Sequence, residues 1–371
     1  MIIFIFLFIQ IIQTNEKKTS FFLAVIFCAS FSQRSFSQIK KDSAKISISG
    51  YADVYYAYYT DSVGDNNYQK FPSISPRSNQ FGLNCANLTF QYDAEKIRSA
   101  ATIQFGDIPR STWHGIFNKI MEAHVGVRMC EKVWVDAGFF RTHFGTEGLL
   151  PKENITSSVA VLTYTEPYYE SGIRLNYTPS KKLTINLFAL NGYNMFTDNN
   201  SKKSFGALLS YSFSEKGNLN YSSYIGDDSP DSDTTSQTLI QNNIYLNYVF
   251  NKFKFQVGGD YCMKQNSNSF TGSGYEYAIM YGALATAKYQ YCEKNAVYAR
   301  YEMLSDDDGI MTGIMGLNLW GATIGGEYKP SDNSYVRIEG RQLNENKNIF
   351  QWENKTTNKR LEVMCHLGVS F

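Results

Sequence analysis

The chain has 371 residues with 35 basic and 34 acidic side chains, so its formal charge is +1. This balance argues against the basic surface that nucleic-acid binding requires, and we expect no nucleic-acid partner. With 27 Tyr and 26 Phe but a negative mean hydropathy, the composition also argues against a bundle of membrane-spanning helices.

The first 37 residues have the features of a secretory signal peptide. Two lysines precede the apolar stretch 21–31, and small residues at alternate positions follow it. This order of segments is typical of an export signal, with cleavage expected near Ser37. Residues 1–13 are superfluous to that signal, so they either lengthen it or follow from a misplaced start codon. The mature chain is then expected to be one domain, residues 38–371.

Throughout the mature chain, apolar and polar side chains alternate with a period of two, which predicts β-strands. One run covers residues 277–291 and is longer than most strands of soluble sheets, which have roughly 3–10 residues. Residues 361–371 alternate in the same way and end on the aromatic Phe371. A soluble sandwich or propeller would also alternate, but with shorter strands and a more highly charged exposed face.

The breaks between these strands alternate strictly between long and short, which makes fifteen connections and sixteen strands, with a range of 14–18. The short turns are expected at 93–96, 130–132, 178–182, 214–217, 251–252, 292–295 and 329–334. The long loops are expected at 60–79, 107–118, 142–168, 192–203, 226–237, 263–275, 305–316 and 342–359.

Short turns at one end and long loops at the other are typical of an outer-membrane β-barrel. Closure leaves no unpaired strand edge in lipid, where backbone groups find no other hydrogen-bond partner. The expected fold is therefore all-β, a transmembrane antiparallel up-and-down barrel with short periplasmic turns and long external loops. Phe371 resembles the terminal signal that bacterial barrel-assembly machinery recognises.

One strand changes phase. Phe81, Leu83 and Cys85 share one face, whereas Leu88, Phe90 and Tyr92 have the opposite phase. A bulge near Ala86 and Asn87 would bring both sets to the lipid face, with Cys85 pointing outward.

Three segments carry a resemblance to a known family. They are SGYADVYYAYY (49–59), VWVDAGFFRTHFGTEG (133–148) and YTEPYYESGIRLNY (164–177). Their order and spacing resemble the β-barrel porin-2 family of Bacteroidetes-type outer membranes. The resemblance implies an outer-membrane diffusion channel, and the family offers no catalytic residues to transfer.

A barrel of about sixteen strands is wide enough for an aqueous channel, so function would depend on the residues that line its lumen. The inward phase holds nine basic and eight acidic residues, which predicts weak ion selectivity. Six of these are Asp53, Arg98, Asp136, Lys254, Asp260 and Glu327. The proposed pore-lining residues are the other eleven: Glu122, Arg128, Arg174, Lys288, Arg300, Glu302, Arg337, Glu339, Arg341, Arg360 and Glu362.

The arginines near the end of the chain have two interpretations. They could create a transverse field across a constriction, or they could form salt bridges that brace the wall, which is favoured because every arginine has a glutamate nearby. The longest loop, 142–168, is the candidate constriction, and its charged residues are Glu147, Lys152, Glu153 and Glu166. The alternative is a surface loop packed against its neighbours.

The expected function is an outer-membrane porin, a water-filled channel for passive diffusion of small hydrophilic solutes through a lipid-embedded barrel. A non-conducting binding or structural barrel is the alternative, and a lipase-like enzyme using His143 beside Glu147 is disfavoured because no serine motif accompanies them. No catalytic, cofactor or metal site is expected. Analogy with sixteen-stranded porins makes a homotrimer one candidate assembly, although no stretch of sequence identifies its interface.

Overall fold

The structure is a computed structural model that describes residues 44–371 except 65–66, 72, 233–235 and 266–276. The export signal expected in residues 1–37 lies outside the described residues, as does most of the loop expected at 263–275. Among the residues that are described, no helix is long and apolar enough to cross a bilayer.

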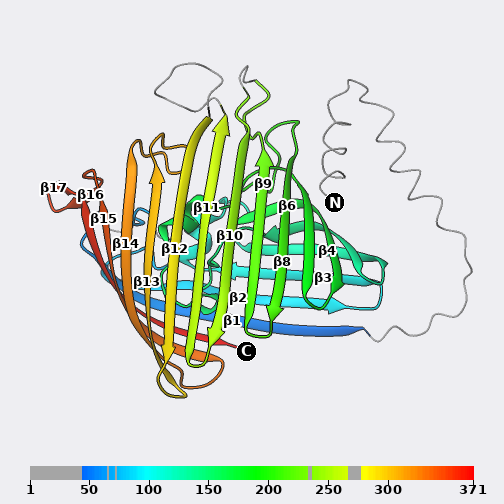
Figure 1. Ribbon diagram of the computed structural model, residues 1–371, viewed down its shortest axis with the longest axis horizontal. Coiled ribbons are helices and arrows are strands. Elements are labelled where there is room, and N and C mark those ends of the chain that lie inside the picture. Colours follow the sequence, from blue (N-terminus) through cyan, green and yellow to red (C-terminus); the bar gives the residue numbers. More distant parts are fainter. Residues whose placement is uncertain (1–43, 65–66, 72, 233–235, 266–276) are drawn as a thin grey trace, which may run out of the picture. The chain divides into compact units, whose positions relative to one another are not determined.

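In the described part of the chain, sixteen antiparallel strands close into one barrel, as predicted (Figure 1). Each strand pairs with its neighbours in the chain, and the last strand, β18, closes the barrel against β1. The strands are β1 (Lys45–Tyr59), β2 (Gln80–Asp93), β3 (Ile97–Phe105), β4 (Ile120–Cys130), β5 (Val133–Arg141), β6 (Tyr169–Ser180), β7 (Leu183–Leu190), β8 (Ser204–Ser214), β9 (Gly217–Gly226), β10 (Leu239–Phe250), β11 (Phe253–Gln265), β12 (Tyr277–Gln290), β13 (Asn295–Asp306), β14 (Leu317–Tyr328), β15 (Ser334–Glu345) and β18 (Lys359–Ser370).

The connections alternate between short turns and long loops, as the sequence predicts. Several long loops contain short elements of their own, which strand periodicity does not detect. These are the helix α3 (Asp107–Thr112), the 3₁₀ turns η1 (Pro151–Glu153) and η2 (Val161–Thr165), and a small hairpin of β16 (Phe350–Trp352) and β17 (Lys355–Thr357).

The outer face of the barrel is apolar. In β12, Tyr277, Ile279 and Tyr281 are exposed, whereas Ala278 and Met280 are buried on the inner face. Alternation of this kind suits a barrel whose outside faces hydrocarbon and whose inside is packed or wet.

The two ends of the barrel sheet meet at β1 and β18. Beyond β18, Phe371 exchanges two backbone hydrogen bonds with Gly50, at 3.0 and 3.1 Å. The ring of Phe371 lies directly over Gly50, where a Cβ would be 2.3 Å from a ring carbon. A glycine is therefore required at this position for the aromatic ring to pack against the first strand.

The bulge predicted in the second strand exists, but its predicted position was wrong. Asp53 lies opposite Cys85 and Val54 lies opposite Leu83, so the extra residue is Asn84 rather than Ala86 or Asn87. The earlier phase change turns Cys85 to the inner face, where it is buried, instead of toward lipid. Bulges re-aim side chains, and this one directs Asn84 into a polar network described below.

Candidate functional site

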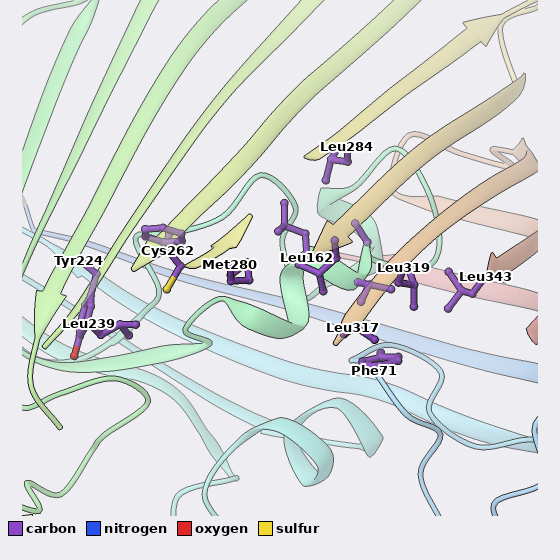
Figure 2. Close-up of a cluster of buried hydrophobic side chains, with 14 of the residues drawn as sticks. Phe71, Leu162, Tyr224, Leu239, Cys262, Met280, Leu284, Leu317, Leu319 and Leu343 are labelled. Carbon is purple, nitrogen blue, oxygen red and sulfur yellow. The ribbon is translucent and has the colours of Figure 1, made fainter. Parts of the chain in front are cut away.

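The longest loop, residues 142–168, folds into the barrel interior and packs against its wall. Figure 2 shows Leu162 of this loop among apolar side chains from the wall strands. Met280, Leu284 and Leu319 belong to the same buried cluster. The fit is close, since a Cβ on Gly282 would lie 2.5 Å from the Leu162 side chain. Burial of its apolar residues against the wall fixes this segment, named here the inward loop, inside the barrel.

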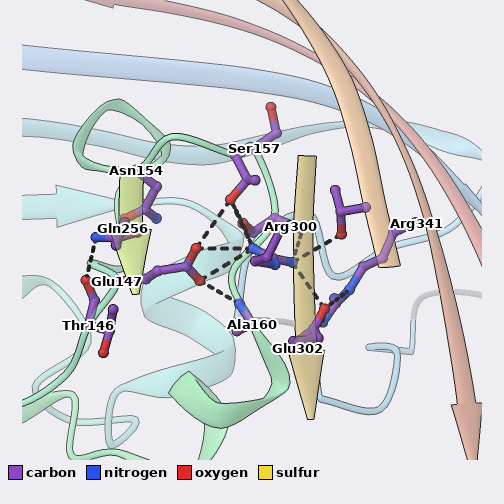
Figure 3. A network of polar contacts seen from close by, with 12 residues as sticks. Thr146, Glu147, Asn154, Ser157, Ala160, Gln256, Arg300, Glu302 and Arg341 are labelled. Atoms are coloured by element: carbon purple, nitrogen blue, oxygen red, sulfur yellow. Dashed lines mark hydrogen bonds and ion pairs between the residues drawn. The ribbon is translucent and has the colours of Figure 1, made fainter. Parts of the chain in front are cut away.

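Arg300 of β13 is a central polar anchor of the inward loop (Figure 3). Its Nη1 donates to both carboxylate oxygens of Glu147, at 3.2 and 3.3 Å, and to the Thr156 hydroxyl at 2.8 Å. Nη1 and Nη2 also donate to the carbonyl and hydroxyl oxygens of Ser158, each at 2.8 Å. Glu147 accepts a further hydrogen bond from the Ala160 amide at 2.6 Å. The positive charge of Arg300 on the wall and the negative charge of Glu147 on the loop, both fully buried, thus neutralise each other.

Two further arginines extend this network along the wall. Arg341 of β15 donates two hydrogen bonds to Glu302, both at 2.8 Å, and lies 3.4 Å from Glu362. Arg360 of β18 donates to the same Glu362 at 2.6 and 2.9 Å. Glu302 also accepts the Val161 amide of the inward loop at 2.6 Å. All four charged side chains are buried, so their charges are paired rather than exposed to an open channel.

A second group of wall charges holds the backbone of the inward loop. Arg337 of β15 pairs with Glu327 at 2.8 Å and donates to three loop carbonyl groups at 2.8 to 3.2 Å. Lys288 pairs with the same Glu327. Glu339 accepts the Ser157 amide at 2.7 Å. The arginine and glutamate side chains predicted on these strands therefore connect the wall to the loop, and their role in solute passage stays a prediction.

The remaining predicted lining residues lie on β4 and β6, away from this network. Arg174 donates to Asp136 at 3.0 Å. Glu122 lies 3.7 Å from His124. Arg128 donates to a turn carbonyl at 2.8 Å. Asp136 is buried, whereas Arg174, Glu122 and Arg128 keep partial access to water.

Two charged residues of the inward loop, Lys152 and Glu153, are exposed. Glu153 forms a two-bond pair with Arg141 at the end of β5, at 2.7 and 2.5 Å. The ammonium group of Lys152 lies 4.6 Å from the centre of the Tyr51 ring. These contacts tie the exposed part of the loop back to the barrel strands.

Glu166, the fourth predicted loop residue, is buried among other carboxyl groups. Burial, together with the nearby charges of Asp260 and Glu147, raises the pKa of Glu166 well above its usual range. Gly145 has φ of +107°, and a Cβ there would lie 2.5 Å from a Glu166 carboxylate oxygen. The two ends of the inward loop are therefore in direct contact, and a side chain at position 145 would separate them.

His143 fastens the start of the inward loop to a different part of the wall. Its Nδ1 is 2.5 Å from Glu170 and its Nε2 is 2.9 Å from the Ser223 carbonyl oxygen, while its ring stacks on Phe188. The Glu170 carboxylate raises the pKa of His143 despite its burial. The sequence analysis considered His143 beside Glu147 as a lipase-like pair, but Glu147 instead accepts hydrogen bonds from Arg300.

A second network, which the sequence analysis missed, lies where the first and last strands meet. Asp53 accepts hydrogen bonds from Asn84 and Tyr335, both at 2.6 Å, and lies 3.2 Å from His366 Nδ1. The other ring nitrogen of His366 is 3.0 Å from the Ser75 hydroxyl. All five residues are buried, so the network joins the closing strands and the first long loop from inside. The sequence signal that could have indicated this network is the inward phase of Asp53 on the first strand and of His366 on the last.

A cavity of about 410 Å³ lies between the inward loop and the wall strands β8, β10 and β11. Its wall side is formed by Leu208, Tyr245, Asn247, Lys254 and Gln256. The loop thus leaves space beside these strands, although Thr146 of the loop also contacts Gln256 of β11 and Asn243 of β10. Within the described residues, no group of three or more His, Cys, Asp or Glu side chains could hold a metal ion.

A closed sixteen-stranded barrel with an apolar outside, a polar inside and a loop folded inward defines a protein of the porin class. Residues 45–371 match the family described as putative beta-barrel porin-2, OmpL-like. The chain belongs to this family, which confirms the resemblance of the three sequence segments to porin-2 proteins. The Bacteroidetes-type membrane stays a prediction. No curated protein matches the sequence.

Solved structures share the fold at low sequence identity. An anion-selective porin from Comamonas acidovorans is 8% identical, with a TM-score of 0.63 over 89% of this chain and 100% of its own. The trimer form of OmpT, an outer membrane protein of Vibrio cholerae, is 11% identical, with a TM-score of 0.57 over 89% and 100%. OmpF of Salmonella typhi, in complex with daunomycin, is 14% identical, with a TM-score of 0.58 over 90% and 100%. These identities establish similarity of fold alone.

Proposed function

We propose that the protein is an outer-membrane porin, a water-filled channel for passive diffusion of small hydrophilic solutes. The observation that carries the proposal is the partial exposure of polar side chains on the inner face of the closed barrel. Arg98 and Arg174 are half-buried and Lys254 is exposed, although all three point inward from spanning strands. Water therefore reaches the inside of the wall, and Lys254 also lines the cavity beside the inward loop.

The membrane setting follows from the outer surface of the barrel. Its exposed apolar residues form rows along the strands, which suits contact with outer-membrane lipid. Export through the signal expected in residues 1–37, and recognition of the last strand and Phe371 by barrel-assembly machinery, are parts of the same proposal. A homotrimer is also proposed, supported by the trimer form of the structurally similar Vibrio cholerae OmpT.

The proposed channel is weakly selective and not enzymatic. Nearly equal numbers of inward acidic and basic residues support weak selectivity. A lipase-like role has no favourable geometry, because both nitrogens of His143 are engaged by other groups. Ser75, His366 and Asp53 form an ordered serine, histidine and aspartate row, but all three are fully buried, so no substrate reaches the hydroxyl.

A non-conducting barrel that serves as a surface-binding or structural protein is the second candidate. It is favoured by the apolar cluster inside the barrel, in which buried side chains of the inward loop and the wall strands pack against one another (Figure 2). The two candidates differ in whether the space that the inward loop leaves inside the barrel forms a continuous path across the membrane.

Liposome swelling distinguishes them. The mature chain, residues 38–371, would be refolded into vesicles and challenged with neutral sugars of increasing size. A porin gives swelling rates that fall steadily with solute size. Vesicles that contain the folded barrel and swell no faster than empty vesicles would support the non-conducting candidate instead.

A further inference from the structure

The charged side chains of the inner wall differ in their access to water according to sign. Of the eight acidic residues in the inward phase, seven are at most 4% exposed. These are Asp53, Asp136, Asp260, Glu302, Glu327, Glu339 and Glu362. The eighth, Glu122, has a side chain that is 23% exposed. Nearly all of the negative charge is therefore enclosed within the protein.

The basic residues divide differently. Arg300, Arg337, Arg341 and Arg360 are buried in pairs with the acids. The other five are in contact with water: Arg98, Arg128, Arg174, Lys254 and Lys288. The side chains of Arg98 and Arg174 are 25% and 24% exposed. The inner wall has almost equal numbers of both signs, but its water-accessible part carries five cations and one anion.

The geometry around Asp136 explains part of this asymmetry. Arg98 donates to its two oxygens at 2.7 and 2.6 Å, and Arg174 donates at 3.0 Å. Two guanidinium groups thus cover one fully buried carboxylate and leave a net positive charge facing water. Arg98 is further held by the Trp134 ring, 4.5 Å from its guanidinium carbon. Nη1 and Nη2 of Arg174 make no hydrogen bond with the described residues, so they remain available to a passing solute.

Lys254 supplies a second positive position, at the cavity beside the inward loop. It makes no ion pair or hydrogen bond with the residues that the structure describes. The acidic residues that line the same cavity are already engaged. Glu147 bonds Arg300 and Glu153 bonds Arg141, while Glu166 is buried with a raised pKa. The charge of Lys254 is therefore not compensated by the loop that faces it.

We infer that the accessible lumen favours small anions, such as chloride, phosphate and carboxylates, through the field of Arg98, Arg174 and Lys254. This inference rests on the proposed channel function and gives a sign to its weak selectivity. Fixed charge of one sign on a narrow, low-dielectric wall concentrates mobile ions of the other sign. At 0.1 M salt, one charge about 7 Å from the ion path changes the anion-to-cation ratio roughly two- to three-fold.

The test is the zero-current potential of single channels in a KCl gradient. The wild-type protein should pass chloride in preference to potassium. Lys254→Gln should lower the chloride-to-potassium permeability ratio roughly two- to three-fold, whereas Lys254→Arg should retain it. Lys181→Gln removes the same charge from an exposed turn between β6 and β7 and should leave the ratio unchanged. Arg174→Gln is the second variant to use if Lys254→Gln does not fold.

Three outcomes are distinguishable. A folded barrel without conductance contradicts the proposed channel, and the anion preference with it. A conducting channel that prefers potassium overturns the anion preference and leaves the porin proposal intact. A channel that prefers chloride, but whose ratio is equally unaffected by Lys254→Gln and Arg174→Gln, overturns the assignment of the preference to these side chains.

Discussion

The contact between Arg300 and Glu147 is the sharpest test of how the inward loop is held. Arg300→Met removes the donor of five hydrogen bonds to the loop and leaves the Glu147 carboxylate buried without its counter-ion. Removing one partner of a buried ion pair costs about 3–5 kcal/mol, because the remaining charge is buried away from water without a counter-ion. We expect the free energy of unfolding to fall by that amount, and the released loop to raise single-channel conductance.

The assay is urea titration of the barrel in lipid vesicles, with Arg300→Met, Glu147→Gln and the double variant. The losses of unfolding free energy in the two single variants should add up to about 1–3 kcal/mol more than the loss in the double variant, because each single variant already breaks the ion pair. Arg128→Gln is the control, because that side chain bonds turn carbonyl groups and should change stability by less than about 0.5 kcal/mol. Additive losses, or a loss below about 1 kcal/mol for Arg300→Met, would refute the anchoring role.

Two further predictions concern the ends of the inward loop. Gly145→Ala should cost about 1–3 kcal/mol, because φ at this position is +107° and the new Cβ meets Glu166, whereas Gly115→Ala, where a Cβ has open space, should be close to neutral in the same titration. The folded-state pKa of Glu166 is raised, so its contribution to stability is complete below the ordinary carboxyl pKa and is lost as pH rises through the raised value. Wild-type stability should therefore fall from acidic to mildly alkaline pH more steeply than that of Glu166→Gln, and equal slopes would contradict this.

The sequence predicted the barrel because local patterns determine it. Alternation along residues 277–291 and the hydrophilic breaks between strands are visible without knowing any tertiary contact. The bulge was misplaced because the apolar residues of β2 show only that the phase changes, whereas the partner residue of Asp53 shows where. That pairing is a contact between two strands, so the alternation of apolar and polar residues along β2 does not reveal it.

The candidate site was less predictable for the same reason. Inward charges could be counted from the strand phase, but their burial depends on where the inward loop lies. Asp136 and Lys254 have the same inward phase, yet one is covered by two arginines and the other is exposed. The family resemblance included Gly145, Glu147 and Glu166 without indicating their roles, which are contacts between the loop and the interior.

Planar-bilayer conductance of the refolded mature chain, residues 38–371, tests the central claim most directly. A porin predicts discrete current steps with a near-linear dependence on voltage, and larger steps for Arg300→Met than for wild type. A barrel that inserts, resists urea as a folded protein and remains electrically silent in both forms would contradict the channel and favour a closed, surface-acting barrel.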